Sequence, residues 1–215
     1  MIEIESWAAE FAQKLREQFG ERLKFLGYQG SYGRGEATET SDIDIVTVLD
    51  RAGLSDLNQY RELVRSMPQG ELACGFLCGQ EELAGWPLFD LLGLVLDTRP
   101  VLGSWEGLAP KTGPEDIRQA LVIGASGLYH GACHAWLYER DPLAALPGLR
   151  KQAFFCLRLA WLCAAGEYVP ARRDLLPRLP PAQREMMETG DGERAYRLLL
   201  EWTGDVLKTQ GPALH

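Results

Sequence analysis

The sequence GSYGRGEATETSDIDIVTVL, residues 30–49, joins a glycine-rich segment to an apolar stretch that carries two aspartates. The short apolar run that precedes it, residues 23–28, predicts a first β-strand. Residues 43–49 predict a second strand that is apolar on both faces, as in a central, covered strand. The glycine-rich segment therefore connects two strands, and the aspartates stand at the start of the second.

Asp42 and Asp44 are two residues apart at the start of this second strand. Side chains alternate between the faces of a strand, so both carboxylates should point to the same side. Two neighbouring carboxylates repel each other unless a cation lies between them. Mg²⁺ suits such a pair because it prefers oxygen ligands and shares its coordination shell with phosphate groups.

The glycine-rich segment supplies groups that can bind phosphate. Gly30, Gly33 and Gly35 let the backbone approach a ligand closely, with N–H groups facing phosphate oxygens. Ser31 adds a hydroxyl donor, and Arg34 is a further candidate nucleotide-binding residue. The alternative is an ordinary hairpin with surface carboxylates. Two acids on one face of an otherwise apolar strand are costly without a role, which favours the phosphate-transfer site.

These motifs resemble the nucleotidyltransferase superfamily that includes DNA polymerase β. In its signature, Gly-Ser is followed by ten residues and then Asp-x-Asp, and Gly30-Ser31 and Asp42-Ile43-Asp44 match it. The chain is most similar to aminoglycoside adenylyltransferases of the streptomycin/spectinomycin type, in which the glutamate of a Glu-Val-Thr strand is the third acid. Glu71-Leu72-Ala73 occupies the corresponding place, with Trp86-Pro87 downstream. The resemblance implies that Asp42, Asp44 and Glu71 form the metal site, or that Glu71 takes the proton of the acceptor.

The second half of the chain carries a weaker part of the same resemblance. Arg150-Lys151 and Ala171-Arg172-Arg173 are similar to basic segments in the helical domain of that family. The resemblance implies that Lys151 and Arg172 bind the triphosphate. Placement of these side chains on the free surface is an equally good interpretation of the sequence.

The distribution of helical and strand patterns predicts an α+β fold. A small N-terminal mixed-sheet nucleotidyltransferase domain is expected over residues 1–110, followed by a C-terminal helical bundle over residues 111–215. The stretch APKTGP, residues 109–114, is the predicted linker. Helices are predicted over 3–19, around 57–64, and over 88–96, 115–139, 148–166 and 193–208, with a third strand over 71–78.

The composition of the chain limits the partners, the cellular location and the metal sites that can be expected. A formal net charge of −8 argues against a nucleic-acid partner. The five cysteines are odd in number and form no Cys-x-x-Cys pair, so they predict reduced thiols in a cytoplasmic protein. The N-terminus lacks the pattern of a signal peptide, and no run is long enough for a membrane span. His130 and His134 have a spacing that can bind metal, but helix packing or surface placement is favoured.

Together these features predict a Mg²⁺-dependent nucleotidyltransferase. It is expected to bind a nucleoside triphosphate, ATP in the first instance, and to move AMP to a hydroxyl of a small-molecule acceptor such as an aminoglycoside. One alternative is the same chemistry on a protein or RNA acceptor. Another is a non-catalytic nucleotide-binding or toxin-neutralising module, which the intact aspartate pair disfavours.

Overall fold

The computed structural model describes residues 2–211 of the chain. It divides into two compact units, Met1–Lys111 and Thr112–His215. The first contains a mixed four-stranded sheet flanked by helices, and the second is built from helices. The predicted α+β class, with a mixed-sheet N-terminal unit ahead of a helical region, is confirmed.

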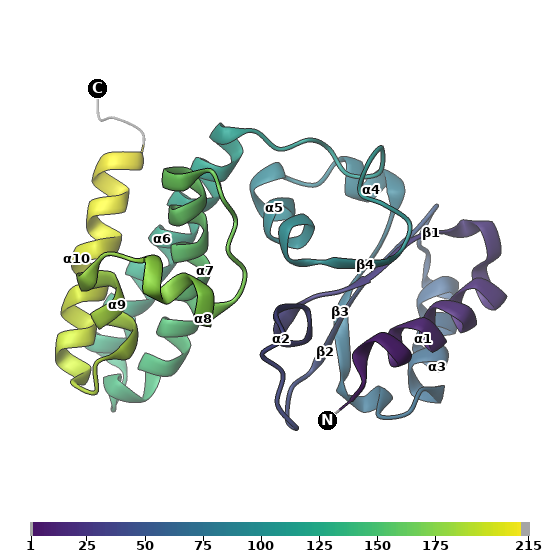
Figure 1. The fold of residues 1–215 in the computed structure, drawn as a ribbon, viewed down its shortest axis with the longest axis horizontal. Coiled ribbons are helices and arrows are strands. Elements are labelled where there is room, and N and C mark those ends of the chain that lie inside the picture. The colour runs from purple at the N-terminus through teal and green to yellow at the C-terminus, as the bar shows by residue number, and fades with distance from the viewer. Residues whose placement is uncertain (1, 212–215) are drawn as a thin grey trace. The chain divides into compact units, whose positions relative to one another are not determined.

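The sheet of the first unit has the strand order β3-β2-β1-β4 (Figure 1). β1 (Leu23–Tyr28) and β2 (Ile43–Leu49) are antiparallel neighbours and coincide with the predicted strands. β3 (Ala73–Gly79) runs parallel to β2. It begins two residues later than predicted, because a short 3-10 helix, η2 (Gly70–Leu72), occupies the segment before it.

β4 (Arg99–Leu102) was not expected from the sequence. It is short, contains Pro100, and lies at the edge of the sheet, antiparallel to β1. Proline lacks a backbone N–H, so it is tolerated on an edge strand where one side of the ladder is unpaired. A proline-containing segment of this length gives no alternating pattern from which a strand could be predicted.

Two pairs of helices cover the faces of the sheet. α1 (Ile4–Phe19) and α3 (Leu54–Ser66) lie on one face, and α4 (Gln80–Ala84) and α5 (Leu88–Asp97) on the other (Figure 1). On β2, Ile43 and Ile45 pack toward α1, whereas Val46 and Val48 join the cluster that includes residues of α4 and α5. Because side chains alternate, Asp44 shares the face of Val46 and Val48.

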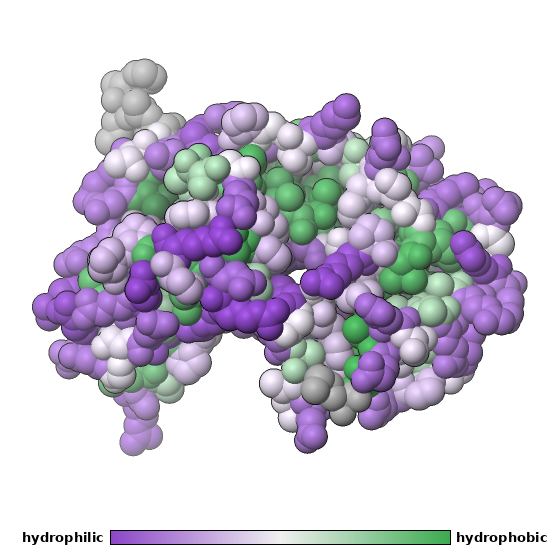
Figure 2. All heavy atoms as spheres, in the orientation of Figure 1, coloured by the Kyte–Doolittle hydropathy of each residue, from purple (hydrophilic) through white to green (hydrophobic). Residues whose placement is uncertain are grey.

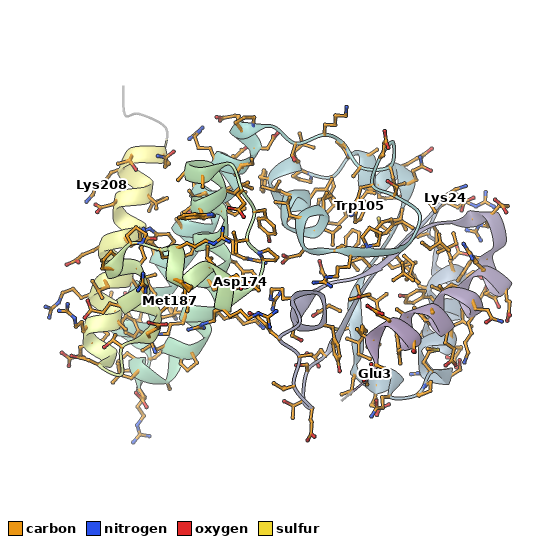
Figure 3. The ribbon with its side chains drawn as sticks, in the orientation of Figure 1. Glu3, Lys24, Trp105, Asp174, Met187 and Lys208 are labelled. Atoms are coloured by element: carbon orange, nitrogen blue, oxygen red, sulfur yellow. The ribbon has the colours of Figure 1, made fainter. Side chains whose placement is uncertain are left out.

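The segment after β4 adds an aromatic contact to the second face. Trp105, labelled in Figure 3, stacks on Phe25 of β1 with ring centroids 3.9 Å apart. Phe25 is fully buried and belongs to the same apolar cluster as Val46 and Val48. The β1–β2 pair is therefore enclosed on both faces, as the continuous apolar run of residues 43–49 predicted.

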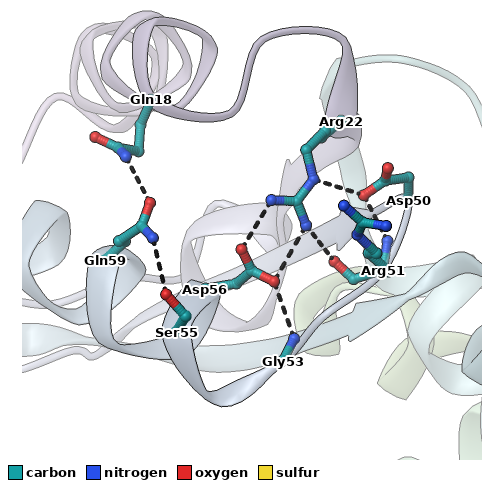
Figure 4. Close-up of polar contacts among 8 residues, drawn as sticks. All are labelled: Gln18, Arg22, Asp50, Arg51, Gly53, Ser55, Asp56 and Gln59. Atoms are coloured by element: carbon teal, nitrogen blue, oxygen red, sulfur yellow. Dashed lines mark hydrogen bonds and ion pairs between the residues drawn. The ribbon is translucent and has the colours of Figure 1, made fainter.

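A polar network joins three segments of the first unit (Figure 4). Arg22 ends a 3-10 helix, η1 (Gly20–Arg22), and its Nε donates to Asp50 Oδ1 at 2.9 Å. Its Nη1 donates to Asp56 Oδ1 at 2.8 Å, and Asp56 also accepts the Gly53 N–H at 3.0 Å. The network ties the end of β2 to the start of α3.

The second unit consists of three long helices and several short ones. α6 (Pro114–Tyr138), α7 (Leu146–Ala165) and α10 (Gly192–Gln210) overlap the predicted helices. The short helices are η3 (Pro142–Ala145), α8 (Arg172–Leu175), η4 (Leu176–Arg178) and α9 (Pro181–Glu188). α9 lies between the helices predicted over 148–166 and 193–208, where the sequence predicted no helix. Pro181 is its first residue, a position where the missing N–H costs nothing.

The core of the second unit is separate and apolar. Leu128, Leu157, Leu175 and Leu199 are fully buried, and Met187, labelled in Figure 3, belongs to the same cluster. On the face shown in Figure 2, hydrophilic side chains predominate and apolar ones form separate patches. None of the helices within residues 2–211 is long and apolar enough to cross a membrane.

Candidate active site

Two acidic side chains stand at the beginning of β2. Asp42 immediately precedes the strand and is exposed, and Asp44 is its second residue and is half-buried. Within residues 2–211, the Asp42 carboxylate has no hydrogen-bond or ion-pair partner, and the Cys74 thiol is the only hydrogen-bond partner of the Asp44 carboxylate. No basic side chain of these residues neutralises either acid, so the pair favours an added cation.

Gly30 lies directly against the Asp44 carboxylate. Its φ of +66° is in the left-handed region, and an added Cβ would lie 1.8 Å from Asp44 Oδ2. Next to it, the Gln29 N–H donates to the Asp44 carbonyl at 2.9 Å. Only glycine fits this backbone and this space. The sequence predicted that the missing side chain of Gly30 leaves space for a ligand. In the structure, the Asp44 carboxylate occupies the space that a Cβ of residue 30 would fill.

The glycine-rich segment forms a short helix, α2 (Gly30–Arg34), and not an open loop. Gly35 ends it with a φ of +68°, and the Glu36 N–H donates to the Ser31 carbonyl at 2.8 Å. The Gly33 N–H is used by the Gln29 carbonyl at 3.1 Å. The first N–H groups of a helix have no partner within it, so those of Gly30 and Ser31 are the ones suited to a phosphate.

Arg34, the basic residue of this segment, is engaged locally. Its Nε donates to Glu36 Oε2 at 3.1 Å, and the two side chains are 13% and 24% exposed. A nucleotide that binds Arg34 has to share the guanidinium with Glu36. Binding of nucleotide by Arg34 and Ser31 stays a prediction.

Cys74 occupies the position on β3 that is paired with Asp44. Its Sγ donates to Asp44 Oδ1 at 3.3 Å. Partial desolvation of the exposed Cys74 side chain, and then the charge and hydrogen bond of Asp44, raise the pKa of the thiol to about 11, so it is neutral at physiological pH. The sequence did not single out Cys74 as a site residue, because the pairing of β2 with β3 cannot be read from either strand alone.

Glu71, the predicted third acid, lies in η2 before β3 and is exposed. Its carboxylate has no hydrogen-bond or ion-pair partner within residues 2–211. No group of three acidic, cysteine or histidine side chains in this part of the chain is arranged to hold a metal ion. The structure thus brings Asp42, Asp44 and Gly30 together but does not gather Glu71 with them into such a group.

The predicted basic residues of the second half lie in the second unit. Lys151 is an exposed residue of α7, and Arg172 Nη2 donates to the Met187 carbonyl at 3.1 Å. Their roles toward a triphosphate stay predictions. His130 and His134 are exposed on α6 with ring centroids 6.3 Å apart, and they belong to no group of three metal-binding side chains among the described residues.

The comparison with family models defines the class of the first unit. Residues 8–87 match the model of the nucleotidyltransferase domain. This segment contains α2, both aspartates, Glu71 and Cys74. The resemblance to nucleotidyltransferase enzymes that the sequence predicted is confirmed.

Particular relatives agree with this class. The chain is 43% identical over 61 residues to protein adenylyltransferase MntA of Thermococcus cleftensis, a match covering 28% of this chain and 58% of the relative. The chain is 33% identical over 64 residues to a protein described as putative protein adenylyltransferase MJ1379, from Methanocaldococcus jannaschii, which covers 30% of this chain and 62% of that protein. The matches thus span about three fifths of the length of these curated relatives.

A solved structure shares the fold over nearly the whole chain. It is spectinomycin adenyltransferase AAD(9) from Enterococcus faecialis, determined with ATP and spectinomycin. The TM-score is 0.57 at 16% identity, with 93% of this chain and 99% of that chain covered. At this identity the likeness shows the fold, and it includes the helical second half.

Proposed function

We propose that this protein is a Mg²⁺-dependent adenylyltransferase that moves AMP from ATP to an acceptor hydroxyl. The observation that carries the proposal is the aspartate pair of β2. Asp42 and Asp44 lie without a basic partner among the described residues, against Gly30, inside the segment that matches the nucleotidyltransferase domain. The names of the relatives, all adenylyltransferases, support AMP as the transferred group.

The donor set fits a hard divalent cation. Asp42 and Asp44 offer carboxylate oxygens, and a site with two carboxylates leaves room for phosphate oxygens and water in the shell of Mg²⁺. When bound there, Mg²⁺ neutralises triphosphate charge and stabilises the charge that develops during transfer. The close approach of Gly30 leaves the Asp44 carboxylate in place for this role.

Protein groups bind the triphosphate and take up the acceptor proton. The Ser31 hydroxyl and the first N–H groups of α2 bind phosphate oxygens and orient the triphosphate. The acceptor oxygen forms a bond to the α-phosphorus while the bond to the bridging oxygen of the β-phosphate breaks, so pyrophosphate leaves. We assign the acceptor proton to the exposed Glu71 carboxylate. The family resemblance alone supports Lys151, Arg172 and Arg34 as further contacts to the triphosphate.

The acceptor is proposed to be a small molecule with hydroxyl groups, and an aminoglycoside or aminocyclitol is the first class to test. The fold shared with a spectinomycin adenyltransferase over 93% of the chain supports this choice. A protein acceptor is the second candidate, because both curated relatives are described as protein adenylyltransferases. Their similarity covers less than a third of the chain, so it bears on the nucleotide-binding half more than on the acceptor.

A single assay separates the two acceptors. The protein is incubated with Mg²⁺ and ATP labelled at the α-phosphate, with spectinomycin, streptomycin or a mixture of proteins. We expect label on a small molecule and equimolar release of pyrophosphate. Label on protein alone would replace the small-molecule assignment with the second candidate. If no pyrophosphate is released with any of the acceptors, whether ATP or another nucleoside triphosphate is supplied, the proposed activity is contradicted.

A further inference from the structure

The Asp44 carboxylate is held from two sides by residues of different segments. Oδ2 faces Gly30, where any Cβ would overlap it at 1.8 Å. Oδ1 accepts a hydrogen bond from Cys74 Sγ at 3.3 Å. The two oxygens of this carboxylate therefore have different neighbours. Oδ2 lies against the backbone of a glycine, and Oδ1 accepts a hydrogen bond from a thiol.

The strand register fixes the thiol in this place. β2 and β3 run parallel with Asp44 opposite Cys74 and Ile45 opposite Gly75. Gly75 has a φ of +135°, and a Cβ there would lie 1.9 Å from the Ile45 carbonyl oxygen. Only glycine permits β3 to pass so close to β2, and this approach brings the neighbouring Cys74 to Asp44.

A thiol at this position cannot replace a carboxylate as a ligand of Mg²⁺. Mg²⁺ selects oxygen ligands and a soft sulfur ligand is disfavoured, so Cys74 is unsuited to coordinate it. A thiol is, however, a weak hydrogen-bond donor that adds no negative charge beside Asp42 and Asp44. Its contribution is to the orientation of Asp44 and not to the charge of the site.

We propose that Cys74 is a positioning residue of the active site. Its S–H turns the Asp44 carboxylate toward Gly30 and leaves two carboxylates, not three, at the paired start of β2 and β3. This inference rests on the proposed function, in which Asp44 holds the divalent cation. Cys74 thus has a role at the position of β3 that is paired with Asp44, where an acidic residue would face Asp42 and Asp44.

The test uses Mn²⁺ as the probe and does not depend on turnover. Binding to the full chain is followed through the electron paramagnetic resonance signal of free Mn²⁺. Loss of a hydrogen bond of about 0.5–1.5 kcal/mol corresponds to about a 2–12-fold weaker affinity. We expect a weakening of this size in Cys74→Ala and recovery in Cys74→Ser, whose hydroxyl restores the donor.

The controls separate this inference from the proposed function. Cys163→Ala changes another exposed cysteine, on α7, and is expected to bind Mn²⁺ as the wild type does. Asp44→Asn is expected to lose binding. Wild-type affinity in Cys74→Ala, or no recovery in Cys74→Ser when both variants are folded by circular dichroism, would overturn the positioning role alone. Absence of Mn²⁺ binding by the wild type would overturn both proposals.

Discussion

At the scale of single residues, Gly30 is the most constrained position of the site. Gly30→Ala places a methyl group where Asp44 Oδ2 lies, so the carboxylate has to move. We expect a large loss of metal binding and of adenylyl transfer, with a stability cost of about 1–2 kcal/mol from the left-handed backbone. Mn²⁺ titration and urea unfolding measure the two effects.

Gly20→Ala is the matched control for this variant. Gly20 also has a positive φ, +55°, but an added Cβ there meets nothing within 4 Å. It should lose stability through its positive φ and keep its activity. Full activity in Gly30→Ala would show that the contact with Asp44 has no bearing on the reaction.

A substitution of Glu71 tests whether its carboxylate takes the proton of the acceptor hydroxyl. Glu71→Gln removes the base but keeps the size of the side chain, so ATP should bind normally while turnover falls by about 10²–10⁴-fold. Single-turnover rates and nucleotide affinity are measured together. Glu81→Gln, at an exposed glutamate of α4, serves as the control. Unchanged turnover in Glu71→Gln would remove this residue from the mechanism.

The aspartates could be predicted from the sequence and Cys74 could not. Strand alternation is a local property, so the spacing of Asp42 and Asp44 was enough to expect them on one face. The pairing of Asp44 with Cys74 depends on the register between β2 and β3, which a turn at Gly70–Leu72 shifts by two residues from the expected start. Proximity between strands is a tertiary property and leaves no local pattern.

At the scale of elements, the Arg22 network makes stability depend on pH. The hydrogen bond from Arg22, with that from the Gly53 N–H, lowers the pKa of Asp56 to about 2. A carboxyl with a lowered folded-state pKa stabilises the fold above its unfolded pKa of about 4, and this contribution is lost as the pH falls through about 2. Asp56→Asn should therefore be less stable than the wild type near neutral pH.

The difference between these two proteins should shrink as the pH is lowered from about 4 toward about 2. Urea unfolding at a series of pH values measures it. Glu62→Gln, in an exposed pair with Arg65, is expected to show little effect at any pH. A difference between wild type and Asp56→Asn that does not change with pH would contradict this account of the network.

Elements with strong periodicity were predicted within a few residues, and short ones were not. α1, β1 and β2 have clear apolar patterns, and their observed bounds agree with the predicted ranges. α2 spans only five residues and includes two glycines, so intrinsic propensity argues against a helix there. The surrounding sheet and the hydrogen bond from Gly33 to Gln29 stabilise this turn, and neither is visible in the local sequence.

At the scale of the whole molecule, each unit has its own apolar core, and we propose that each is a separate folding domain. Lys111 is exposed at the end of the first unit. Limited trypsin digestion should therefore cut early after Lys111 and leave two folded fragments. If Lys151 and Arg172 bind triphosphate as proposed, the N-terminal fragment should bind ATP more weakly than the intact chain. Rapid degradation of both fragments would contradict independent folding.

The central claim is that Asp42 and Asp44 make this chain a metal-dependent adenylyltransferase. The most direct measurement is transfer of label from ATP labelled at the α-phosphate, with and without Mg²⁺, by wild type, Asp42→Asn, Asp44→Asn and the surface variant Asp205→Asn. The account predicts Mg²⁺-dependent transfer by the wild type and Asp205→Asn, and none by folded Asp42→Asn or Asp44→Asn. Wild-type transfer by either of these two variants would contradict it.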